Sequence, residues 1–64
     1  MPHDRLILEA TRQAYDRSER DAATMFIYVG TRNGQIVAYV RSLAEGIPDD
    51  ATDIRRLLTV NPQV

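Results

Sequence analysis

The stretch Thr24–Ser42, TMFIYVGTRNGQIVAYVRS, carries the strongest structural signal in the chain. Two apolar segments flank Asn33-Gly34, the pair most typical of a two-residue type I′ turn, because both turn positions need a positive φ. We therefore predict a β-hairpin over residues 24–42 with its turn at residues 33–34. A three-residue loop with a bulge at Gly34 is the alternative.

The two-residue turn sets the register of the hairpin and divides its side chains between two faces, since strand side chains alternate. One face carries Ile27, Val29, Thr31, Ile36, Ala38 and Val40. The other face carries Phe26, Tyr28, Val37 and Tyr39, with Arg32 and Arg41 beside them. Both faces are apolar, so the hairpin needs cover on both sides.

Before the hairpin, the apolar periodicity predicts an amphipathic helix over about residues 4–20. Leu6, Ile7, Ala10 and Ala14 share one face of this helix, and charged side chains occupy the other. Asp4 has a side chain suited to the N-cap. The apolar face is expected to pack on the hairpin.

After the hairpin, Ser42 and Glu45 have the spacing of a capping box. Gly46 and Pro48 follow so closely that only a single turn fits there.

A second helix is predicted over about residues 49–59, on the helical spacing of Ala51, Ile54, Leu57 and Leu58. Three acidic residues, Asp49, Asp50 and Asp53, would lie at its positive N-terminal end. Residues 60–64 are expected to be frayed.

The predicted fold is therefore a single α+β domain of residues 1–64, with helix–β-hairpin–helix (αββα) order. A two-stranded antiparallel ribbon would pack on the helices. The expected core residues are Leu6, Ile7, Ala10, Ala14, Ile27, Val29, Ile36, Val40, Ile54 and Leu58.

The composition limits the ways in which so short a chain can be stabilised. Domains below about 70 residues usually add disulfides, a metal ion or oligomerisation to a small core. The 64 residues include no cysteine, and the single His3 cannot form a metal site alone. Oligomerisation or partner binding is therefore the expected support.

The charge and hydropathy patterns exclude several classes of function. A net charge of −1 gives no strong field for nucleic acid, although all eight basic residues are arginine. No apolar run is long enough for a membrane span or a signal peptide. We expect a soluble, cytoplasmic protein without membrane association.

No motif indicates catalysis. Residues 49–53, DDATD, match the magnesium-binding Asp-Asp-x-x-Asp string of isoprenoid synthases, but those enzymes are all-helical and much longer. The favourable position of acidic groups at a helix start explains the string. Without cysteine, and with one terminal histidine, no nucleophile–base pair is available. We expect no catalytic residue, no metal, no cofactor and no enzymatic activity.

The aromatic face of the hairpin allows three interpretations. It could be internal core, an interface with a second copy or a protein partner, or a stacking platform for single-stranded nucleic acid. The interface is favoured, because neither strand carries the lysine, proline or inward charge that usually protects an exposed edge. The expected partner-binding residues are Phe26, Tyr28, Val37, Tyr39, Arg41 and Arg32.

The alternative function is a small nucleic-acid-binding module. It would use Arg32, Arg41, Tyr28 and Tyr39, with Arg55 and Arg56 as additional basic groups.

The predicted helix–hairpin–helix order is similar to that of the small head-to-tail joining proteins of tailed phages. This resemblance covers the order of elements only, and no residue role is transferred from it. It implies a phage or mobile-element origin.

Overall fold

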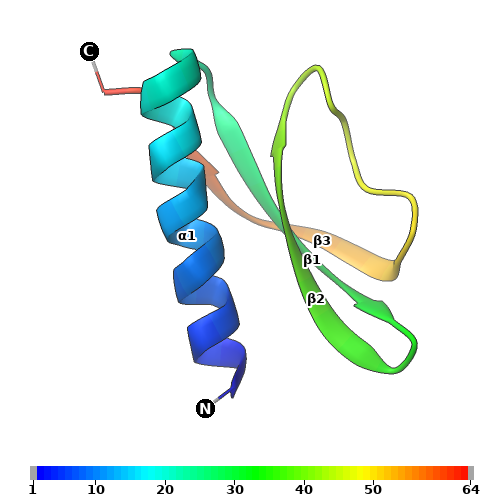
Figure 1. Ribbon diagram of the computed structural model, residues 1–64. Coiled ribbons are helices and arrows are strands. Elements are labelled where there is room, and N and C mark those ends of the chain that lie inside the picture. The colour runs from blue at the N-terminus through cyan, green and yellow to red at the C-terminus, as the bar shows by residue number, and fades with distance from the viewer. Residues whose placement is uncertain (1, 64) are drawn as a thin grey trace.

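The computed structural model describes residues 2–63, which form one helix and three strands (Figure 1). The elements are α1 (Pro2–Asp21), β1 (Met25–Arg32), β2 (Gln35–Ser42) and β3 (Thr52–Val60). The strands form one antiparallel sheet in the order β2-β1-β3. The predicted α+β class is confirmed. The predicted αββα order is wrong, because a third strand replaces the second helix.

The β1–β2 hairpin has the predicted turn and register. Asn33 and Gly34 both have positive φ, 53° and 75°, as a type I′ turn requires. Arg32 pairs with Gln35 next to the turn, and the register continues without interruption to the pair Met25 and Ser42. The alternative three-residue loop is therefore excluded.

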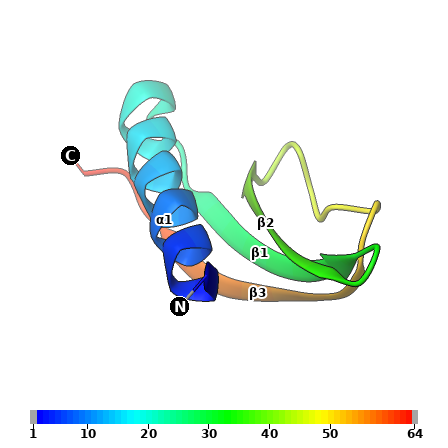
Figure 2. The same cartoon turned by 60° about the horizontal axis from the view of Figure 1, so that its bottom comes forward.

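Helix α1 lies across one face of the sheet (Figures 1 and 2). Ala10, Ala14 and Ser18 are buried, and their small side chains let the helix approach the strands closely. The helix ends at Asp21, where Ala22 adopts a positive φ of 50° and Ala23 donates its N–H to the Ser18 carbonyl at 3.2 Å. The predicted first helix is confirmed, but it starts two residues earlier, so Asp4 lies in its first turn and is not the N-cap.

Strand β3 forms where a helix was predicted, and β1 explains the difference. An isolated helix of about eleven residues is marginal in water. As a strand, the same segment pairs with the free edge of β1, which would otherwise expose its backbone groups. The β-branched Thr52, Ile54, Thr59 and Val60 favour this extended conformation. The resemblance to head-to-tail joining proteins depended on the second helix, so it loses its basis.

The core lies between α1 and the sheet and is smaller than predicted. It consists of Ala10, Ala14, Met25, Ile27 and Val60, with Ala38 and Val40 packed against it. The predicted core residues Leu6, Ile7, Val29 and Ile54 are half-buried.

Two predicted core residues are exposed, and one predicted tail residue is buried. Ile36 and Leu58 are each 44% exposed. Ile36 follows the hairpin turn, whose tip lies away from α1 (Figure 1), and α1 contacts β3 less than it contacts β1 or β2. Val60, expected to be frayed, ends β3 and is 3% exposed because it packs beside Met25. Met1, and Val64 of the expected frayed tail, lie outside the described residues.

Gly30 allows the start of β3 to approach β1. A Cβ atom at this position would lie 3.0 Å from the Thr52 carbonyl oxygen and 3.1 Å from Cγ1 of Ile54. The register between β1 and β3 shifts here, and Asp53 adopts a positive φ of 52°. The close approach therefore depends on glycine at position 30.

Gly30→Ala is expected to destabilise the fold by about 1–3 kcal/mol, because the added methyl group meets backbone that cannot move without disturbing β3. Chemical denaturation monitored by circular dichroism measures the change. Gly34→Asn is the comparison: an added Cβ there meets no atom within 4 Å, so any loss of stability reflects only the strain of its positive φ of 75°. Equal stability of Gly30→Ala and wild type would contradict this packing.

Candidate functional site

The candidate site is the outer face of the sheet, defined here as the face opposite α1. Alternation along β1 places Met25 and Ile27 toward the helix, so the residues between them point to the outer face. All six residues predicted to bind a partner lie on this face: Phe26, Tyr28, Arg32, Val37, Tyr39 and Arg41. The structure thus brings the predicted set together.

The chain itself covers part of the outer face. Strands β2 and β3 lie on either side of β1, so the connection between them, residues 43–51, must cross the sheet. We call this connection the strap. It lies on the opposite side of the strands from α1 (Figures 1 and 2). Ala51 lies against Gly30, and Pro48 of the strap is buried.

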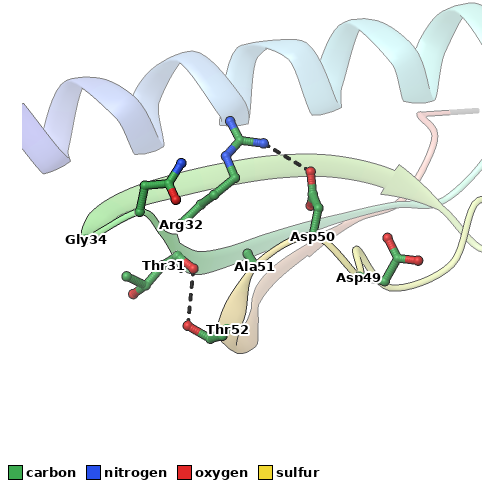
Figure 3. A pocket seen from close by; sticks show the side chains of 8 residues that line it. Thr31, Arg32, Gly34, Asp49, Asp50, Ala51 and Thr52 are labelled. Atoms are coloured by element: carbon green, nitrogen blue, oxygen red, sulfur yellow. Dashed lines mark hydrogen bonds and ion pairs between the residues drawn. The ribbon is translucent and has the colours of Figure 1, made fainter.

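Asp50 attaches the strap to the outer face. Its Oδ1 accepts a hydrogen bond of 2.8 Å from the Tyr39 hydroxyl. Its Oδ2 forms an ion pair of 3.0 Å with Arg32 (Figure 3). Thr52 donates a hydrogen bond of 3.2 Å to the Thr31 carbonyl beside this pair. Asp50 was predicted to lie at the N-terminus of a helix, and the correction follows from the replacement of that helix by β3.

Glu45 attaches the other end of the strap. The predicted capping-box pair forms without a longer helix: Ser42 donates its N–H to Glu45 at 2.8 Å, and Glu45 donates its N–H to the Ser42 hydroxyl at 3.2 Å. Arg17 of α1 forms an ion pair of 2.9 Å with the same carboxylate. Arg17 also donates a hydrogen bond of 3.1 Å to the Val40 carbonyl.

The strap leaves an open hollow near the tip of the hairpin. It has a volume of about 430 Å³ and is lined by residues 31–34 and 49–52 (Figure 3). Arg32 and Asp50 neutralise each other inside it, so the hollow presents no net charge from this pair to a ligand. Across residues 2–63, no cluster of three histidine or acidic side chains is arranged to bind a metal ion.

Beyond the strap, arginines lie over the aromatic rings of the outer face. The guanidinium carbon of Arg41 lies 5.5 Å from the centre of the Tyr39 ring, and that of Arg56 lies 5.4 Å from the centre of the Phe26 ring. The structural ion pairs among the described residues do not include Arg41 or Arg56. The contacts that hold these two guanidinium groups are therefore those with the ring faces, whose quadrupoles attract a cation.

The predicted residues differ in how far they are accessible. Tyr28 is only 8% exposed, with the Phe26 ring centre 6.4 Å from its own. It therefore serves the fold rather than a surface. Phe26, Val37, Tyr39 and Arg41 are half-buried, and Arg32 is exposed but paired with Asp50.

Sequence reasoning understated two residues of this face. Arg56 was assigned a helical position, because the strand character of residues 52–60 depends on β1 and not on local pattern. No local pattern indicated that Asp50 would bind the sheet, since its partners Tyr39 and Arg32 come from two different strands.

Comparison with known proteins provides no assignment: no family model matches the chain, and no curated protein or solved structure is significantly similar to it. Within the described residues, no helix is long and apolar enough to cross a membrane.

Hydrogen bonding shifts the pKa values of the groups that hold the strap. The hydrogen bond from Tyr39 holds the pKa of Asp50 below its ordinary value, and the same bond raises the pKa of Tyr39. The hydrogen bond from the Ser42 N–H, followed by that from Arg17, holds the pKa of Glu45 below its ordinary value.

These shifts predict a defined pH dependence for the strap. The lowered carboxylate pKa values stabilise the fold above the ordinary carboxyl pKa of about 4, and this contribution is lost as pH falls through the folded-state values. The raised pKa of Tyr39 stabilises below the ordinary tyrosine pKa of about 10, and this contribution is lost as pH rises through the folded-state value. These hydrogen bonds should therefore hold the strap against the sheet between about pH 4 and pH 10.

Asp50→Asn is expected to lower the pKa of Tyr39 toward its ordinary value, because the charged acceptor is removed. Titration of the tyrosine ring carbons by NMR resolves Tyr39 from Tyr15 and Tyr28. Asp49→Asn, which removes the neighbouring carboxylate of the strap, is the control and should leave the titration of Tyr39 unchanged. An unchanged Tyr39 pKa in Asp50→Asn would show that the strap is not attached through this bond.

Proposed function

We propose that the protein is a non-enzymatic interaction module that binds a second copy or another protein through its β1–β2 hairpin. The observation that carries this proposal is the arrangement of the outer face, where Phe26 and Tyr39 each lie beneath an arginine. Neither arginine forms an ion pair with a carboxylate of residues 2–63.

The composition of this surface is that of a protein interface. Aromatic residues and arginine are enriched in interfaces, and the strongest contributions usually come from a few such side chains. The stacked arginines are partly ordered before binding, so less side-chain entropy is lost when a partner arrives. The surface therefore supports association better than it supports a small-molecule site.

The strap carries exposed apolar side chains. Leu43 and Ile47 are 82% and 66% exposed, the two highest values among the large apolar side chains that the structure describes. A chain that exposes these apolar groups, together with arginines that form no ion pair within residues 2–63, suits a partner with both apolar and acidic groups.

The same geometry gives less support to nucleic acid. A stacking platform needs accessible rings, and Tyr28 is buried. Arg32 is neutralised by Asp50, so two of the four residues required for that function are already engaged within the chain. Arg55 and Arg56 remain exposed, but the net charge of −1 provides little phosphate attraction.

Arg41→Glu is expected to weaken association by about tenfold or more, because it reverses a charge on the outer face and removes the contact with the Tyr39 ring. Sedimentation across a hundredfold dilution measures self-association, and affinity capture compares binding to other proteins. Arg12→Glu is the control, since it makes the same charge change on the exposed side of α1. If Arg41→Glu matches wild type in both measurements, the outer face is not the binding surface.

Labelled single- and double-stranded oligonucleotides are expected not to bind at tens of micromolar protein in low salt, where phosphate contacts are strongest. Fluorescence anisotropy tests this. Saturable binding that is lost in Arg41→Glu would replace the protein-binding proposal with the nucleic-acid one.

A further inference from the structure

The outer edge of β2 presents a defined set of backbone groups. Arg32 and Gln35 flank a two-residue turn, so they form a hydrogen-bonded pair, and such pairs alternate along an antiparallel ladder. It follows that Ile36, Ala38, Val40 and Ser42 direct their N–H and C=O groups away from β1. Two observed bonds agree, because Arg17 reaches the Val40 carbonyl and Glu45 reaches the Ser42 N–H.

These contacts divide the edge of β2 into two halves. Toward Ser42, the helix and the strap occupy three of these backbone groups: Arg17 binds the Val40 carbonyl, Glu45 accepts from the Ser42 N–H, and the Gly46 N–H binds the Ser42 carbonyl. Toward the turn, no contact recorded for residues 2–63 occupies the N–H or C=O groups of Ile36 and Ala38. The free part of the edge is thus short and sharply limited.

The two outer edges of the sheet are not equivalent. Strand β3 has two register irregularities, a positive φ at Asp53, and the adjacent charges of Arg55 and Arg56. Bulges and charges of this kind discourage the addition of another strand. Strand β2 pairs regularly along its length and carries no lysine, proline or bulge.

We propose that two copies of the chain pair through the free edge of β2, antiparallel and about a two-fold axis at Val37, to form a six-stranded sheet. This inference rests on the proposed function and specifies its partner and its register. Ile36 of each copy would lie opposite Ala38 of the second copy. The N–H and C=O groups of Ile36 and Ala38 in the two chains would then form four hydrogen bonds across the axis.

Other pairing registers would leave fewer of these backbone groups with a hydrogen-bond partner. An axis at Ala38 would place Ile36 opposite Val40, whose carbonyl already accepts a hydrogen bond from Arg17. An axis at Ile36 would place Ala38 opposite Gly34, within the turn. The axis at Val37 avoids both and brings no like charges directly opposite, since Tyr39 faces Gln35 across it.

The side chains around this axis are also suited to pairing. Ile36 is 44% exposed and borders an open hollow of about 600 Å³, which Leu6 and His3 line from α1. The helix and the tip of the hairpin diverge in this region (Figure 1), which leaves room for a neighbouring strand. Ala38 and Val40 of the second copy would cover Ile36 and Gly34. The pairing thus explains an apolar residue that the monomer leaves uncovered.

Cross-linking at the axis tests the register directly, because the chain has no natural cysteine. In Val37→Cys, the two thiols would meet across a non-hydrogen-bonded pair, where Cβ atoms are close enough for a disulfide. Mild oxidation should give a disulfide-linked dimer at least tenfold faster than in Leu57→Cys, an exposed site on β3. Equal rates for the two variants would overturn the register.

A proline variant tests the backbone pairing. Ala38→Pro removes an N–H that has no partner in the monomer, so it should preserve the circular dichroism spectrum and raise the dimer dissociation constant at least tenfold. Thr59→Pro makes the matched change on the outer edge of β3 and should leave the dimer intact. Sedimentation across a hundredfold dilution measures both variants.

The outcomes separate this inference from the proposed function. A wild-type dimer that survives Ala38→Pro, without rapid cross-linking at position 37, overturns the edge pairing and leaves the Arg41 surface standing. A wild type that is monomeric at millimolar concentration overturns self-pairing, and capture with Arg41→Glu then decides the proposed function. If Ala38→Pro fails to fold, the cross-linking rates decide.

Discussion

The position of β1 between β2 and β3 is the constraint on which the rest of the structure depends. Both edges of β1 are paired, and its two faces contact different parts of the chain: α1 covers Met25 and Ile27, and the strap passes over the other side. Because β2 and β3 are separated by β1, the chain must cross the outer face to connect them. The aromatic face of the hairpin is therefore partly occupied by the protein's own backbone.

The hairpin and α1 could be predicted from the sequence because their signals are local. Asn33-Gly34 determines the turn, and the turn determines which side chains share a face, so the grouping of Phe26, Tyr39 and Arg41 follows from a few neighbouring residues. Strand β3 could not be predicted in this way. Its apolar residues fit a helix equally well, and only the free edge of β1, far away in sequence, favours the strand.

The same limit applies to the candidate site. Which residues face outward was predictable, but which of them stay accessible was not, because burial of Tyr28 and pairing of Arg32 depend on the strap and β3. The hydrogen bond from Arg17 to the Val40 carbonyl on the edge of β2 was equally unpredictable, since Arg17 belongs to the helix. Two parts of the hairpin are not occupied by α1 or the strap. One is the pair of rings beneath arginines on the outer face, and the other is the free backbone of Ile36 and Ala38 along the edge of β2.

The strap also has a consequence for the order of folding. The β1–β2 hairpin closes over two residues, and such local contacts form early at a low entropic cost. Strand β3 must instead return across residues 43–51 to reach β1, so its docking closes a longer loop and is expected to come later. During that interval, β1 has an open edge and Met25 lacks Val60 as its neighbour. The last strand to arrive is thus the one that completes the core.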